Sequence, residues 1–138
     1  MSNHLHALLG LKNSDQSINS IVSNAKRFLA YEIVKRLKEQ QQNNVFEKLS
    51  PAVNASDSKR GKLHQVFEPS FDCKECYSEA FAEQKLTYMH QNPCKGTWSL
   101  AVSPGEYKHS SAKFYLTGEN GEYAVTNHKQ LMDVDLSK

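Results

Sequence analysis

Two distant stretches of the sequence carry residue types that together could bind a metal ion and act as a nucleophile. His4 and His6 flank a leucine near the start, whereas Tyr88 and Asn92 lie four residues apart more than eighty positions later. Imidazole nitrogens and an amide oxygen can bind a cation, and a tyrosine oxygen can attack an electrophile. Three protein ligands leave positions on the ion open for substrate oxygens. If these side chains meet, the sequence encodes a metal site beside a nucleophile.

A strand and a helix are the elements expected to hold these residues. Alternation over residues 3–11 predicts a strand whose leucines face the core and whose two imidazoles project together from the other face. Over residues 79–92 a helix is expected, with Ser78 as its N-cap. Pro93 ends it, because proline lacks an N–H and disfavours helical geometry in the preceding residue. The tyrosine and the asparagine then share one face of that helix.

The rest of the chain predicts further helices, a second strand and polar connections. An amphipathic helix is expected over about 16–41. A polar stretch over 42–62, which contains the basic KRGK, predicts a long loop, and residues 63–71 predict the second strand. A short helix is expected around 110–116, and residues 119–138 predict a tail with weak structure. The far side of the first helix carries basic residues and one tyrosine: Arg27, Tyr31, Lys35 and Lys38.

Length and composition favour one water-soluble domain. The chain has 138 residues, of which 38% are hydrophobic, and its mean hydropathy is −0.66. No apolar run approaches the roughly 18 residues of a membrane span, and the first residues lack a signal-peptide pattern. We therefore expect a cytoplasmic protein without a membrane partner. The three cysteines do not form the even set typical of a disulfide framework.

The charge is unevenly distributed along the sequence. Residues 26–62 hold nine lysines and arginines against four acidic residues, although the net charge of the whole chain is only +2. A basic segment of this kind favours a polyanion as partner. An ordinary solvated surface is the alternative.

The order and flanks of these motifs resemble the HUH tyrosine transposases. The matching stretches are NHLHALLGL at the start, QVFEPSF at 65–71, YMHQNPCK at 88–95 and YKHSSAKFYL at 107–116. The chain is most similar to the REP-associated tyrosine transposase branch and to the transposases of small insertion sequences. The resemblance covers most of residues 1–118, which we expect to form the transposase-like domain, with 119–138 as its tail.

The resemblance implies an α+β fold, with a ferredoxin-like antiparallel sheet and helices packed on one side. It also implies metal-dependent cleavage and rejoining of single-stranded or hairpin DNA, as in DNA transposition. Tyr88 would attack the scissile phosphate and form a 5′-phosphotyrosine intermediate. His4, His6 and Asn92 would hold Mg²⁺ or Mn²⁺. The phenol needs this help because little of it is ionised at neutral pH.

Further residues take supporting roles under this interpretation. The basic side chains of the first helix would contact DNA phosphates, as would Lys95 after the asparagine–proline turn, although an ordinary surface lysine is the alternative for Lys95. His90 would donate to phosphate or orient Tyr88, or cap the end of the helix. A homodimer and a monomer both stay open, because both occur among the transposases that the chain resembles.

The chain departs from the family pattern at its start. Members of the family carry a strand and a helix before the histidine strand, so the resemblance implies that the first strand or strands are missing here. Three explanations stay open: a start codon assigned too late, a decayed remnant of a mobile element, or completion by a partner chain. Whether the truncated chain is an active enzyme depends on which one holds.

Two other functions are compatible with the sequence. The first is a non-catalytic single-stranded nucleic-acid binder derived from such a transposase, which would bind through its basic helix, KRGK and exposed aromatic rings. The second is a small zinc-stabilised interaction module that uses Cys73, Cys76 and Cys94. A single CxxC pair is weak support for zinc, because structural zinc normally has four ligands, and we expect free thiols.

Overall fold

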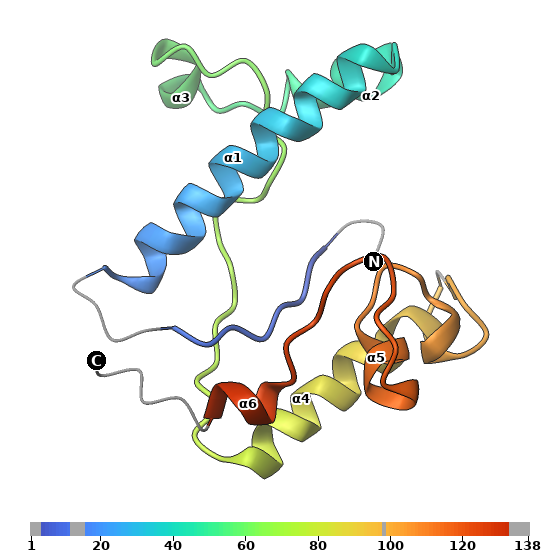
Figure 1. Ribbon diagram of the computed structural model, residues 1–138. Coiled ribbons are helices and arrows are strands. Elements are labelled where there is room, and N and C mark those ends of the chain that lie inside the picture. Colours follow the sequence, from blue (N-terminus) through green and yellow to red (C-terminus); the bar gives the residue numbers. More distant parts are fainter. Residues whose placement is uncertain (1–3, 12–15, 98, 133–138) are drawn as a thin grey trace. The chain divides into compact units, whose positions relative to one another are not determined.

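The computed structural model describes residues 4–11, 16–97 and 99–132 (Figure 1). Within these ranges the ordered elements are all helical. In chain order they are α1 (Ile18–Glu39), α2 (Asn43–Leu49), α3 (Ala55–Lys59), α4 (Glu79–Gln91), the 3-10 helices η1 (Asn92–Cys94) and η2 (Pro104–Glu106), α5 (Ala112–Thr117) and α6 (His128–Met132).

The expected ferredoxin-like antiparallel sheet is wrong for the part of the chain that the structure describes. No residue of that part lies in a strand. Residues 4–11 and 63–71, which were expected to form strands, form none in the structure, and the chain bends at residues 67 and 69; residue 3 lies outside the described residues. The two segments also belong to different units of the chain. A strand needs a neighbour to pair its N–H and C=O groups, and the alternation pattern cannot supply one.

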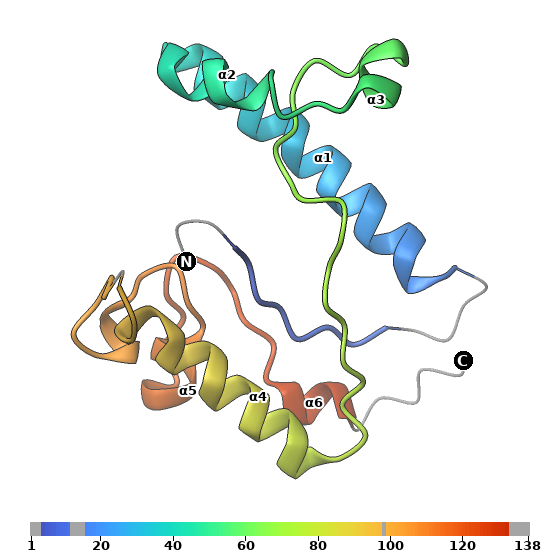
Figure 2. The same cartoon turned by 180° about the vertical axis from the view of Figure 1, so that it is seen from behind.

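The chain divides into two units, which are described separately. The α1 unit comprises residues 14–73, and the α4 unit comprises residues 1–13 together with 74–138. In both views of the α1 unit, α2 lies beside the end of α1 (Figures 1 and 2).

Helix α1 begins and ends close to the expected positions. The Ser17 hydroxyl oxygen accepts a hydrogen bond from Ser20 N–H at 3.2 Å, which caps the first turn. Arg36 and Lys38 lie in the last turn, where cations interact favourably with the free carbonyl groups. The expected apolar stripe is only partly covered, because Phe28 is 63% exposed.

One lysine binds the second half of the segment 63–71. The Lys26 ammonium donates to the carbonyl oxygens of Glu68 and Ser70, each at 2.8 Å, and to that of Pro69 at 3.5 Å. It also lies 5.6 Å from the centre of the Phe71 ring. Carbonyls that bind an ammonium are not available to a neighbouring strand, and proline has no N–H to offer. At residues 68–70 the side chain of a helix therefore takes the place of a strand partner.

The polar stretch expected as a loop contains α2 and α3. Helix α3 forms because the Asn54 side chain accepts from Asp57 N–H at 2.8 Å and so caps its first turn. Asp57 also forms an ion pair with Lys62 at 3.1 Å. That pair lowers the pKa of the Asp57 carboxyl, mainly through its hydrogen bond to the ammonium. Gly61 ends the segment with φ +86°, a conformation that glycine adopts without strain.

In the α4 unit, helix α4 has the ends that the sequence predicts. The Ser78 hydroxyl accepts from Phe81 N–H at 3.2 Å at the start. After Gln91 the chain continues as η1, which contains the buried Pro93. The buried apolar side chains of the described residues are few: Ala82, Leu86, Pro93 and Ala112.

The segment expected as a tail contributes one helix to this unit. Helix α6 contacts α4, and both views show it beside the first half of α4 (Figures 1 and 2). Residues 133–138 lie outside the described residues. None of the helices in the described ranges is both long enough and apolar enough to cross a membrane.

Candidate metal and nucleophile site

The two histidines lie next to each other on the extended segment 4–11. Their ring centroids are 4.9 Å apart in an edge-on arrangement. Burial, with a smaller contribution from the charge of His4, lowers the pKa of the His6 imidazole. The neutral imidazole that this favours is the form that binds a metal ion.

Segment 4–11 does not bury its leucines as the strand pattern predicts. Leu5 is 76% exposed and Leu9 is 58% exposed. Within the described residues there is no paired strand to extend a core beneath them. The histidines are nevertheless placed as expected with respect to each other, because residues two apart in an extended chain project to the same side.

Helix α4 brings the tyrosine and the asparagine to these histidines. The ring centroids of Tyr88 and His6 are 5.7 Å apart, with the rings nearly perpendicular. Asn92 Nδ2 lies 3.0 Å from His6 Nε2, within hydrogen-bond distance. Helix α4 also fixes the backbone of Asn92, its C-cap residue, because the Asn92 N–H donates to the Tyr88 carbonyl oxygen. Four side chains from two distant segments therefore lie in one cluster.

This cluster offers nitrogen and oxygen ligands on one side of an accessible phenol. The hydrogen bond at 3.0 Å shows that the amide of Asn92 reaches the ring nitrogen of His6. A half-turn of that amide presents its oxygen to the same point, so an imidazole and a carbonyl oxygen could share a cation. Tyr88 is 59% exposed. The arrangement can therefore bind a divalent ion and still leave the tyrosine oxygen open to a substrate.

His90 lies apart from Tyr88 and on a different face of α4. Its Nε2 is 2.9 Å from the Ser111 hydroxyl, and its ring lies 5.4 Å from that of Tyr115. Burial lowers the pKa of the His90 imidazole. In this structure His90 joins α4 to α5 through Ser111 and Tyr115, and it does not orient Tyr88.

The basic residues expected to contact DNA are exposed and belong to both units. Arg27, Lys35 and Lys38 lie on α1, whereas Lys95 follows η1 in the α4 unit. The Arg27 guanidinium lies 5.0 Å from the Phe28 ring, and the Lys95 ammonium donates to Gln91 Oε1 at 2.6 Å. Within α1 the three cations follow one stripe with Tyr31, which is 65% exposed.

The three cysteines are free thiols in the structure. Cys73 is exposed, whereas Cys76 and Cys94 are half-buried. None of them belongs to the cluster of metal-ligating side chains found among the described residues.

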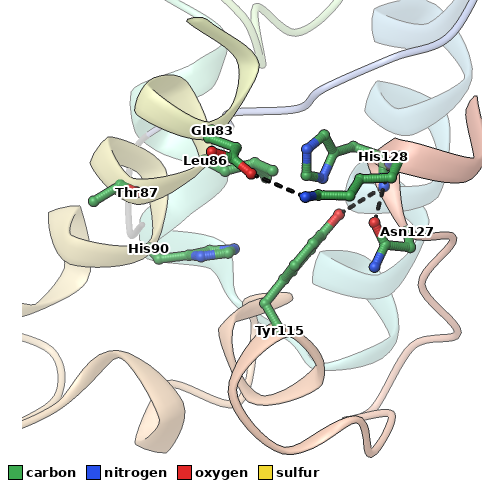
Figure 3. Close-up of a pocket in the computed structure, with 8 residues that line it drawn as sticks. Glu83, Leu86, Thr87, His90, Tyr115, Asn127 and His128 are labelled. Atoms are coloured by element: carbon green, nitrogen blue, oxygen red, sulfur yellow. Dashed lines mark hydrogen bonds and ion pairs between the residues drawn. The ribbon is translucent and has the colours of Figure 1, made fainter. Parts of the chain in front are cut away.

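A second group of polar side chains, which the sequence reasoning missed, lies on another face of α4. A pocket of about 280 Å³ is lined by residues of α4, α5 and the α6 region (Figure 3). Glu83 and His128 line this pocket, and together with Glu79 they bring their ligand atoms within 4.8 Å of one another. The i, i+4 spacing of the glutamates was the one available signal. Nothing near His128 in the sequence predicts that it packs against them.

Comparison of the chain with family models, curated proteins and solved structures finds no match. The resemblance to the HUH tyrosine transposases therefore depends on the motifs and on the geometry of the residues that carry them.

Proposed function

We propose that the protein is a metal-dependent HUH-type tyrosine transposase that cleaves and rejoins single-stranded DNA. One observation carries the proposal. His4, His6, Tyr88 and Asn92, which the sequence motif selects in advance, lie within contact distance although more than eighty residues separate the two segments. If the histidine pair and the tyrosine–asparagine pair had unrelated roles, their close approach would not be expected.

The residues present fit a divalent ion, and they favour Mn²⁺ over Mg²⁺. His4 and His6 would supply nitrogen ligands, and Asn92 would supply an oxygen. Mn²⁺ accepts such mixed sets, whereas Mg²⁺ prefers oxygen and retains its waters. When bound, the ion would polarise a phosphate oxygen and neutralise the charge that grows there.

Tyr88 would perform the covalent step. Its oxygen forms a bond to the phosphorus while the bond from phosphorus to the 3′-oxygen breaks, which leaves a 5′-phosphotyrosine and a free 3′-hydroxyl. Because Tyr88 is 59% exposed, its proton can pass to water, and the departing 3′-oxygen takes up a proton in turn. The reverse attack by a 3′-hydroxyl rejoins the strands, since the tyrosyl ester conserves the energy of the original bond.

A labelled hairpin oligonucleotide incubated with the protein and Mn²⁺ tests the proposal. On a denaturing gel we expect a protein-linked band that Tyr88→Phe abolishes and chelation prevents, while binding on a native gel stays within about twofold. Tyr77→Phe, an 80% exposed tyrosine in the same unit, is the matched control and should retain the band. An adduct that persists in Tyr88→Phe would reject the nucleophile.

The ligand assignment has its own test in metal titration. His6→Ala should weaken Mn²⁺ binding at least tenfold, which corresponds to about 1.4 kcal/mol. His109→Ala removes an exposed histidine elsewhere in the α4 unit and should have no effect. Equal Mn²⁺ affinities for His6→Ala and the wild type would argue against this site.

A non-catalytic single-strand binder is the second candidate, favoured by the exposed stripe on α1. Arg27, Lys35 and Lys38 could neutralise phosphates, and Tyr31 could stack on a base. This candidate predicts a shift on native gels with no protein-linked band under any metal condition.

A further inference from the structure

His128 is buried in the α4 unit, and its two ring nitrogens have no hydrogen-bond partner among the described residues, although its backbone N–H donates to the Tyr115 hydroxyl oxygen at 3.0 Å. Its side chain lies at the start of α6, and the residue is only 5% exposed. Neither ring nitrogen has a hydrogen-bond partner within the described part of the chain. A buried imidazole without a partner loses the hydrogen bonds that water would provide, a cost that folded proteins normally avoid.

Two carboxylates of α4 lie within reach of this ring. Glu79 and Glu83 are four residues apart, so both project from one face of the helix toward α6. Their oxygens and a His128 nitrogen lie within 4.8 Å of one another. Figure 3 shows His128 and Glu83 reaching toward each other from α6 and α4. An acidic pair and an unpartnered imidazole therefore share one small volume.

We propose that Glu79, Glu83 and His128 form a binding site for a divalent transition metal such as Zn²⁺, which fixes α6 against α4. The ion would give His128 the partner that its ring lacks. One nitrogen and two carboxylate oxygens are ligands that Zn²⁺ accepts, and a fourth position would remain for water. Mg²⁺ and Ca²⁺ are excluded as preferred occupants, because the buried ligand is a nitrogen.

Lys129 marks the place that the cation would take. Its ammonium lies 2.7 Å from a Glu79 oxygen and 3.3 Å from a Glu83 oxygen. With one ammonium between two carboxylates, the cluster keeps a net charge of −1. A divalent ion makes the cluster neutral once Lys129 is displaced to solvent, and the lysine has a flexible stem that permits this.

The ligand geometry requires only a small contraction. A tetrahedral ion at about 2.1 Å from each ligand places neighbouring ligand atoms roughly 3.4 Å apart. The present upper bound is 4.8 Å. Both glutamates are exposed, so their side chains can change rotamer at little cost while the buried imidazole stays in place.

This site is separate from the proposed transposase site. At about 100° per residue, Tyr88 projects roughly opposite to Glu79 on α4. The inference therefore does not depend on DNA cleavage, and each site can fail without the other.

A Zn²⁺ titration of the full-length protein, followed by the ring nitrogen resonances of its six histidines in NMR spectra, tests the proposal. We expect one His128 ring nitrogen to shift in proportion to one equivalent of Zn²⁺. Residue-specific signals separate this event from binding at His4 and His6 or at the thiols. A His128 resonance that stays unchanged at saturating Zn²⁺ overturns the proposal.

Two substitutions of exposed side chains separate a metal site from a set of ion pairs. Glu83→Gln should weaken the Zn²⁺ response of His128 at least tenfold, whereas Glu106→Gln, elsewhere in the unit, should not. Lys129→Met removes the competing ammonium and should tighten binding severalfold. If Lys129→Met weakens binding, or Glu83→Gln leaves it unchanged, the three residues do not ligate the metal.

Discussion

The substitution Leu86→Ala tests how the core of the α4 unit holds the helix that carries the tyrosine. Leu86 is 7% exposed and lines the pocket of about 280 Å³ beside α5 and α6 (Figure 3). Replacing it by alanine removes three carbon atoms, which corresponds to about 2.4 kcal/mol at ~0.8 kcal/mol for each buried CH₂. A cavity term adds to this loss. Because the side chain already faces an open pocket, the cavity term is small, and we expect a total of about 2.5–3 kcal/mol, near the lower end of the usual range.

Urea unfolding followed by circular dichroism measures this loss in the free energy of unfolding. Leu116→Ala is the matched control, because Leu116 also lies in a helix but is 69% exposed. With about a third of its surface covered, it should cost less than about 1 kcal/mol. If the two variants differ by less than about 0.5 kcal/mol, Leu86 is not part of a packed core and α4 is held by other contacts.

Three further predictions concern pH, a helix cap and the lysine of the α1 unit. Burial places the pKa of His90 below its ordinary value of about 6.5. The unfolded protein therefore binds more protons at this residue than the folded protein does, and the free energy of unfolding falls as the pH drops from about 7.5 through 6.5. His90→Gln should remove this part of the decline; a difference between the two proteins that is constant with pH would contradict it. Ser78→Ala should lower stability by about 1 kcal/mol in urea unfolding, because it removes the cap of α4; no loss would contradict the cap. Lys26→Met should speed amide hydrogen exchange in residues 63–71 at least several-fold, since three carbonyls lose their donor; unchanged exchange there would show that other contacts hold the segment.

Local signals, which act over a few residues, predicted α1, α4 and α5 but missed α2, α3 and α6. Ser78 caps the helix that it was expected to cap, and Pro93 follows the end of α4. The polar stretch over 42–62 was expected to be a loop, yet the Asn54 cap is enough to start α3. A residue that can cap a helix is visible in the sequence, but whether its cap is strong enough to start a helix is not.

The predicted sheet is wrong for the described residues, because a strand depends on a partner elsewhere in the chain that the local sequence does not reveal. Residues 63–71 have the composition of a strand, yet Lys26 of α1 binds their carbonyl oxygens. The proximity of Tyr88 to His6 is equally non-local, and only the motif suggested it. No motif pointed to His128, whose surroundings are set by the packing of α6 on α4.

Helix α4 presents Glu79 and Glu83 on one side and Tyr88 on the other, and the number of residues between them sets that division. Inserting one residue between Glu83 and Tyr88 would rotate everything after it by about 100°. The phenol and the amide of Asn92 would then turn away from His6, while both glutamates would stay where they are. Changes in length within this helix should therefore be far less tolerable than exchanges of side chains along it.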